Sequence, residues 1–182
     1  MNLDRIISVQ NSITVFRDGD RCLKVFNEDC AKADVINEAL NQARMEETTV
    51  TVPKILEVTE VNGKWAIVSE YIKGENLEQY VLKNGPVTPK ECYRWACQLC
   101  EAVQYLHQEN SEKPAIIHCD IKPGNVMITR SGDICLIDFN TSLIFRRDKK
   151  AVAVTDGYAA PEQYSPVQST PNAAMPPQRE GI

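Results

Sequence analysis

The sequence predicts an α+β fold in which a small β-sheet with one helix precedes a mainly helical part. The turn signals Asp18-Gly19 and Asn62-Gly63 each separate two strand-like segments, which is the pattern of a β-hairpin. Between these hairpins, apolar residues recur at helical spacing. Further along, a capping box that starts at Thr88 predicts the beginning of a long helix, with proline at its first position.

The first 72 residues are expected to follow the order β-β-α-β-β. Lys24 falls on the second strand, and Glu38 lies near the edge of the apolar helix face. The predicted strands are residues 13–16, 21–26, 54–61 and 64–71, and the helix is residues 29–44 with Val35, Ile36, Ala39, Leu40 and Ala43 on its buried face.

The second part is expected to span residues 73–164 and to combine the long helix with three short strands. Residues 165–182 are rich in proline, poor in apolar residues and without periodicity, which predicts a flexible tail. The predicted buried stripe of the helix is Tyr93, Ala96, Cys100, Val103 and Leu106, and the strands are expected near residues 115–117, 126–129 and 134–137.

Composition narrows the class of protein. A formal net charge of -5 argues against nucleic acid as a partner, because such surfaces need a basic excess. The sequence has neither the pattern of a signal peptide nor an apolar stretch of membrane-spanning length, so a cytoplasmic location and no membrane partner are expected. Seven cysteines at irregular spacing predict reduced, mostly buried thiols, with the Cys97 and Cys100 pair inside the helix core.

Two loops carry the residue types that phosphoryl transfer needs. In HCDIKPGN, Asp120 is a candidate base for an acceptor hydroxyl and Lys122 a candidate cation for the phosphate. Asn125 and Asp138 supply hard oxygen ligands suited to magnesium. A lone aspartate is more often a cap or turn former, but several such motifs in the right order make that interpretation improbable here.

The spacing from His118 to Asn125, followed by Asp138-Phe139-Asn140, resembles the catalytic and metal loops of protein kinases. GYAAPEQY at residues 157–164 is similar to the end of the activation segment in bacterial serine/threonine kinases. The resemblance covers residues 14–164 and implies a kinase-like fold with an N-lobe and hinge at residues 1–72 and a partial, truncated C-lobe at residues 73–164.

The resemblance also implies ATP and Mg²⁺ as cofactors and a protein as substrate. By it, Lys24 holds the α- and β-phosphates and Glu38 is its ion-pair partner. Ser69 resembles the gatekeeper of the lobe connection, where backbone groups from Glu70 to Ile72 face adenine. Within the family, a lysine placed as Lys122 accompanies Ser/Thr acceptors.

Several positions depart from the family pattern. Residues 7–14 contain no glycine, Cys119 stands where many kinases have arginine, and Asn140 replaces the glycine after Asp-Phe. The chain ends eighteen residues after Tyr164, where kinases continue through further helices. Three alternatives follow: a Ser/Thr kinase, a weak or inactive kinase-like scaffold that binds nucleotide or a partner protein, and a small-molecule phosphotransferase. Oligomers that form through the exposed, truncated lobe are also expected.

Overall fold

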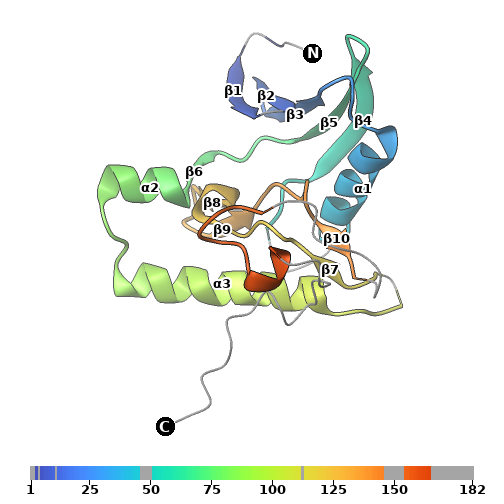
Figure 1. The fold of residues 1–182 in the computed structure, drawn as a ribbon. Helices are drawn as coiled ribbons and strands as arrows, with labels where there is room; N and C mark the ends of the chain where they lie inside the picture. The colour runs from blue at the N-terminus through green and yellow to red at the C-terminus, as the bar shows by residue number, and fades with distance from the viewer. Residues whose placement is uncertain are drawn as a thin grey trace.

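Hairpins build an antiparallel five-stranded sheet at the top of the molecule, as Figure 1 shows. The computed structural model describes residues 3, 5–10, 12–45, 51–111, 113–145 and 154–164. The sheet order is β1-β2-β3-β5-β4. Its strands are β1 (Ile6–Gln10), β2 (Ile13–Asp18), β3 (Arg21–Phe26), β4 (Ile55–Val61) and β5 (Lys64–Glu70). Four of the five were predicted, and β1 was missed because its apolar residues do not alternate toward one buried face.

Both predicted hairpin turns are present and have the backbone conformation that their residues favour. Gly19 joins β2 to β3 with φ +61°. Asn62 and Gly63 join β4 to β5 with φ 52° and 75°. Two consecutive positive φ angles match the twist of the flanking strands, which explains the asparagine-glycine pair.

The predicted helix is present as α1 (Lys32–Ala43) and begins later than expected. The Cys30 amide N–H donates to the Asn27 carbonyl in a turn, so the chain is not yet helical there. The buried face also differs from the prediction. Ile36 and Leu40 are 36% and 50% exposed, whereas Glu38 is only 3% exposed. The helix is therefore rotated about its axis so that a carboxylate points inward.

The lower part combines three short helical elements, one long helix and two small sheets (Figure 1). The sheets have the orders β6-β8-β9 and β10-β7. The strands are β6 (Gly74–Asn76), β7 (Ile116–Ile117), β8 (Val126–Thr129), β9 (Ile134–Leu136) and β10 (Leu143–Ile144); the helices are α2 (Leu77–Asn84), α3 (Pro89–His107) and the 3₁₀ turns η1 (Pro123–Asn125) and η2 (Pro161–Gln163). The prediction missed α2, which begins with a capping box between Asn76 and Gln79.

Gly74 is required where β6 runs against β8. A Cβ atom at this position would lie 1.9 Å from the Ile128 carbonyl oxygen. The close approach pins the start of the lower part to β8, which follows directly on the loop that carries the candidate catalytic residues.

The capping box at Thr88 and Glu91 opens α3 as predicted, but of the predicted buried stripe only Leu106 is buried. Tyr93 is 76% exposed, and Cys100 is exposed as well. The helix instead buries the face that carries Trp95, whose indole N–H donates to the Gly132 carbonyl at 2.8 Å. The other buried residues of the helix are Ala102 and Leu106.

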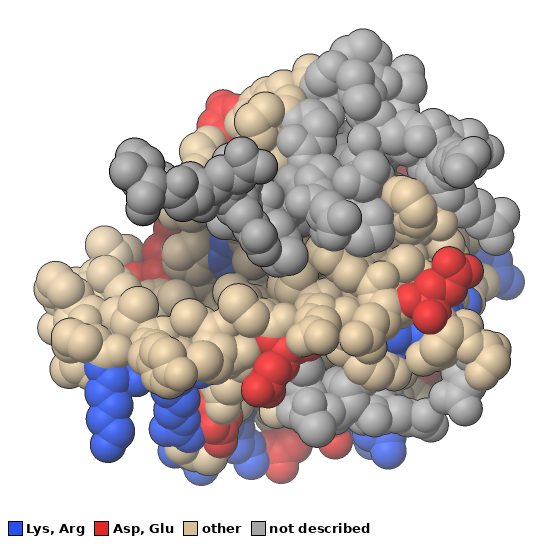
Figure 2. Space-filling model, turned by 90° about the horizontal axis from the view of Figure 1, so that it is seen from below, with Lys and Arg blue, Asp and Glu red and all other residues tan. Residues whose placement is uncertain are grey.

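The exposed face of α3 corrects the cysteine prediction too. Cys92, Cys97 and Cys100 are exposed, while Cys135 is buried. All seven thiols are free. Figure 2 shows the molecule from the side of α3, where uncharged side chains form much of the central surface.

Each part has its own hydrophobic core. The upper core packs α1 against the sheet, and the lower core packs α3 against β7, β8 and β9. Among the described residues, no helix is long and apolar enough to cross a membrane. The predicted tail at residues 165–182 lies outside the described residues.

Candidate active site between the two lobes

A cavity of about 490 Å³ lies between the sheet and the loops of the lower part. Its volume falls within the range of cofactor sites. Seven of the eight residues predicted for the site line this cavity: Lys24, Glu38, Glu70, Ile72, Lys122, Asn125 and Asp138. The eighth, Asp120, lies behind Lys122 and Asn125 and bonds to both.

Lys24 on β3 joins the two lobes through its ammonium group. Its Nζ lies 2.6 Å from Glu38 Oε1 on α1 and 2.6 Å from Asp138 Oδ1 on the loop after β9. Burial favours the neutral amine, but the charges of both carboxylates outweigh it and raise the pKa of Lys24. The side chain is therefore a fixed cation in the lining of the cavity.

The Glu38 carboxyl is buried, and only one of its two oxygens accepts a hydrogen bond within the described residues. Burial raises its pKa against the attraction of Lys24. Oε2 has no hydrogen-bond partner within the described residues. Because an unpaired buried oxygen is costly, the Glu38 carboxylate depends on the Lys24 cation.

Asp120 is held by three donors from two segments, its own loop and the stretch that contains Thr155. Its Oδ2 lies 2.8 Å from Lys122 Nζ and accepts from Asn125 Nδ2 at 2.9 Å. Its Oδ1 accepts from the Thr155 hydroxyl at 2.6 Å. Partial burial would raise the pKa of this carboxyl, but the hydrogen bonds from Lys122 and Thr155 outweigh burial and lower it. The group is thus an ionised acceptor beside a hydroxyl.

Thr155 is a site residue that sequence reasoning missed. Its hydroxyl donates to Asp120 and also accepts from Lys122 Nζ at 3.1 Å. The only sequence signal was its place shortly before the Gly157–Tyr164 motif. No periodicity or charge pattern marks a lone threonine, so only the folded chain reveals the contact.

His118 fixes the distance between the two functional loops. Its Nε2 lies 3.2 Å from the Ile137 carbonyl, so that nitrogen carries the proton, and its Nδ1 accepts from the Asp120 amide N–H at 3.3 Å. Complete burial lowers the pKa of the imidazole. The Phe139 ring centroid lies 4.8 Å from the imidazole centroid. A neutral histidine therefore couples the position of Asp120 to that of Asp138.

Asn125 and Asp138 fit the oxygen chemistry of a magnesium site. Asn125 uses Nδ2 to bind Asp120, which leaves its Oδ1 as a possible metal ligand. Asp138 adopts φ 65°, an uncommon angle for a residue with a side chain. No cluster of three or more His, Cys, Asp or Glu side chains converges within the described ranges. Two protein oxygens, with the rest from phosphates and water, is the pattern that Mg²⁺ tolerates.

The end of the cavity where the sequence predicted adenine is formed by the end of β5 and the connection that follows it. Ser69, Glu70 and Ile72 line the cavity there, together with Cys22. The Glu70 and Tyr71 amides already donate to Lys54 and Asp20 carbonyls. The Ile72 amide has no acceptor within the described part of the chain, so it is a free donor at this end.

A model of the protein kinase domain matches residues 20–175 of the sequence. The chain belongs to the protein kinase family. It is 30% identical over 120 residues to protein kinase kin1 of Schizosaccharomyces pombe, covering 63% of this chain and 13% of kin1. It is 32% identical over 136 residues to a probable serine/threonine-protein kinase PknB of Corynebacterium glutamicum, covering 69% of this chain and 20% of that protein.

Serine/threonine-protein kinase PrkC of Bacillus subtilis is 27% identical over 128 residues, covering 69% of this chain and 19% of PrkC. The matched region therefore spans at most about a fifth of these relatives' length. The likeness concerns the part of the kinase fold that contains the cavity, and what the longer proteins do is not carried over with it.

This kinase chain departs from its family at the upper wall of the cavity. Ile7 and Ser8 of β1 and Ile13 and Val15 of β2 line the wall, and no glycine occurs among residues 7–14. The wall is therefore a paired hairpin with side chains where a glycine-rich loop would present backbone donors.

The catalytic loop also departs at Cys119, which adopts φ 65°. Burial raises the pKa of its thiol to about 12, so the side chain is neutral. Its backbone carbonyl accepts from Gln163 Nε2 at 2.9 Å, which ties η2 to the catalytic loop of the kinase. Asn140, which replaces the glycine after Asp-Phe, has no positive φ, whereas Asp138 adopts one.

Proposed function

We propose that this site binds magnesium and ATP and transfers the γ-phosphoryl group to serine or threonine hydroxyls of proteins. The observation that carries the proposal is the Asp120 carboxylate, which accepts from a threonine hydroxyl at 2.6 Å beside a lysine ammonium at 2.8 Å. A base that holds an aliphatic hydroxyl next to a phosphate-binding cation is the arrangement that phosphoryl transfer requires.

Each predicted residue takes a role in this proposal. Lys24 neutralises the α- and β-phosphates, and Glu38 keeps its ammonium in place through the 2.6 Å ion pair. Lys122 steadies the transferring group, and Asp120 takes the proton from the acceptor. Asn125 and Asp138 hold magnesium, which supplies positive charge to the phosphate oxygens when bound.

Adenine binding is assigned to the connection after β5. The free Ile72 amide is the donor, and the backbone of Glu70 supplies the neighbouring acceptor. Ser69 lines the same end of the cavity. Its small side chain leaves space behind the adenine, as expected for a serine gatekeeper.

The experiment is a transfer assay with labelled ATP, magnesium and three peptides that differ only in a serine, threonine or tyrosine acceptor. We expect label on the serine and threonine peptides and none on the tyrosine peptide. Label on tyrosine alone would overturn the acceptor assignment. Label on a small alcohol or amino sugar, with none on any peptide, would favour a small-molecule phosphotransferase.

A second candidate function is a kinase-like scaffold with little or no turnover. The glycine-free wall at residues 7–14 favours it, because phosphates lose a cradle of backbone donors there. A thermal shift with ATP that persists without any transfer would support this reading. The exposed face of α3 is where we propose that a partner or second copy binds, and a measurement of mass in solution tests the second copy.

A cytoplasmic location belongs to the same proposal. Seven free thiols, three of them exposed, suit a reducing compartment. Fractionation of cells that make the protein tests this location, and recovery with membranes would contradict it.

A further inference from the structure

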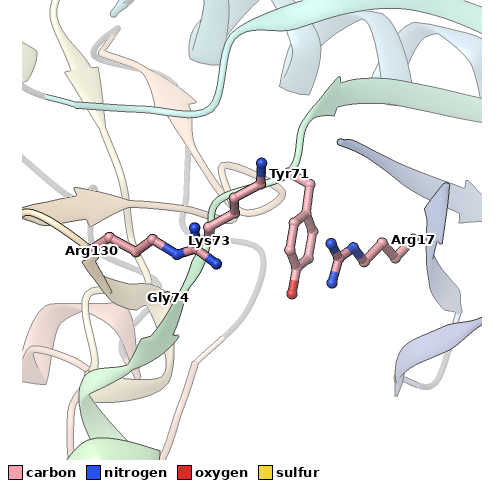
Figure 3. A pocket seen from close by; sticks show the side chains of 5 residues that line it. All are labelled: Arg17, Tyr71, Lys73, Gly74 and Arg130. Atoms are coloured by element: carbon pink, nitrogen blue, oxygen red, sulfur yellow. The ribbon is translucent and has the colours of Figure 1, made fainter. Parts of the chain in front are cut away.

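A second, smaller cavity of about 240 Å³ lies beside the connection between the lobes. It is lined by Arg17 of β2, Tyr71 and Lys73 of the connection, Gly74 of β6, and Arg130 after β8 (Figure 3). Three cationic residues from three separate segments therefore line one cavity, in a chain with a net charge of -5. Such a concentration of positive charge in an acidic protein indicates a site for an anion.

The Arg17 guanidinium is held in a fixed orientation. Its Cζ lies 4.1 Å from the centroid of the Tyr71 ring, and its Nε donates to the Gly19 carbonyl at 2.9 Å. Neither Nη group has a hydrogen-bond partner within the described residues. Figure 3 shows the Tyr71 hydroxyl between the guanidinium groups of Arg17 and Arg130. A planar fork with free N–H groups is suited to bind two oxygens of one anion.

The charge balance of the cavity fits a dianion. Lys73 pairs with Asp20 at 2.8 Å, and the side chain of Asp20 is 76% exposed. The pKa of Asp20 is lowered, mainly by its hydrogen bond with Lys73 and to a smaller extent by the charges of Arg17 and Arg130. All three cations therefore act on the same region. Three cations against one carboxylate leave an excess of two positive charges.

We propose that this cavity binds the phosphate group of a phosphate monoester. At neutral pH such a group carries a charge of about -1.5 to -2, which matches the excess. The cavity is smaller than the roughly 300 Å³ at which small-molecule pockets begin, so it takes a head group while the rest of the ligand stays in solvent. Because Arg17 and Arg130 belong to different lobes, the bound phosphate contacts both.

The test is isothermal titration calorimetry of the full chain with inorganic phosphate, a phosphoserine peptide and the same peptide without phosphate. The two phosphate-bearing probes are expected to bind and the unmodified peptide is not. Tighter binding of the phosphopeptide assigns the site to phosphorylated chains, and equal binding assigns it to free phosphate or small monoesters. Absence of heat with both phosphate-bearing probes would overturn the proposal.

Variants locate the binding. Arg17→Gln and Arg130→Gln are each expected to weaken phosphate binding about tenfold, because a charge-assisted hydrogen bond is lost. The matched control is Lys64→Gln, which removes a lysine that is 37% exposed on the far end of β5, and it should leave affinity unchanged. Lys24→Met should also leave it unchanged. Loss of binding in the Lys24 variant, with retention in both arginine variants, would place the phosphate in the larger cavity and contradict the inference.

Discussion

The lower and upper walls of the large cavity differ in how much of the transfer chemistry they provide. On the lower wall, Asp120 accepts hydrogen bonds from Asn125 and Thr155 and is paired with Lys122. On the upper wall, β1 and β2 present side chains and no glycine. The lower wall thus holds the groups of the proposed transfer chemistry, whereas the upper wall has no glycine-rich backbone that would hold the phosphates.

In the proposed function, this difference makes nucleotide binding depend mainly on one residue of the upper wall. Lys24 is the cation that contacts both Glu38 and Asp138, at 2.6 Å each. If the β1-β2 hairpin supplies few donors, affinity for ATP depends on this ammonium and on the magnesium ligands more than it does where a glycine-rich loop is present. In the proposed function, the lower wall therefore sets the rate of transfer and Lys24 sets the affinity for ATP.

The largest expected effect is on the lower wall. Asp120→Ala should reduce the rate of transfer by about 10²–10⁴-fold, the range for loss of a general base, because the acceptor hydroxyl then keeps its proton. The affinity for ATP should stay within about twofold of wild type, since Asp120 lies behind the cavity lining. Rapid-quench kinetics and ATP titration measure the two quantities. Asp34→Ala, in the first turn of α1, is the control carboxylate. An unchanged rate would remove Asp120 from the role of base.

Loss of the upper-wall cation should act on affinity instead. Lys24→Met is expected to weaken ATP binding at least tenfold, in line with roughly 1.5–3 kcal/mol for a hydrogen bond to a charged group. Melting temperature should also fall, because Glu38 would be left buried without a cation. Calorimetric titration measures the affinity for ATP. The double variant Lys24→Met with Glu38→Gln removes the unpaired buried carboxylate, so it should recover the melting temperature without recovering the affinity for ATP. If Lys24→Met binds ATP with wild-type affinity, residues other than Lys24 hold the nucleotide.

A smaller effect is expected from Thr155. Thr155→Ala removes one hydrogen bond to Asp120 and should lower the rate of transfer about tenfold, close to 1.4 kcal/mol. Thr155→Ser keeps the hydroxyl and should retain most of the rate. If alanine and serine variants are equally slow, the hydroxyl is not what positions the base.

The smallest effect concerns the pH dependence of stability. Burial lowers the pKa of His118 in the folded state, so its contribution to stability is present above the unfolded value near 6.5 and is lost as pH falls below it. The free energy of unfolding should drop by up to roughly 1 kcal/mol per histidine between pH 6.5 and 5.5.

Urea titrations at several pH values measure how steeply the free energy of unfolding falls as the pH is lowered, and His118→Asn should make this slope shallower. The pKa of His107 is also lowered by burial, so His107→Asn is the matched control and should flatten the slope less, because that ring is only half-buried. An NMR titration of both imidazoles in wild type gives an independent check. Protonation of His118 at its ordinary pH would contradict the proposed neutral bridge between the loops.

Local signals made much of the fold predictable. The turns at Gly19 and Gly63 and the capping box at Thr88 depend on residues next to one another in sequence, and the structure contains all three. Apart from Leu106, the buried face of α3 was predicted wrongly, because two apolar faces compete in its sequence. Trp95 decides between them through a hydrogen bond to Gly132, which no helical periodicity encodes.

The candidate site was predictable where the motif was contiguous. The residues from Asp120 to Asn125 come from one loop, and their meeting with Asp138 followed from the family pattern. Thr155 and Arg17 were not predictable, because each gains its significance from a partner distant in sequence. Long-range contacts of single polar residues leave no periodic trace.

A single-turnover experiment tests most directly whether the lower wall is built for phosphoryl transfer, because it separates the chemical step from nucleotide affinity. Protein in excess over labelled ATP, with saturating magnesium and a serine peptide, is quenched over time. We predict that label moves from ATP to the peptide in one exponential phase, and that Asp120→Ala slows this phase about 10²–10⁴-fold while still binding ATP. Wild-type protein that binds the ATP and transfers no label would contradict the claim that the lower wall is built for phosphoryl transfer.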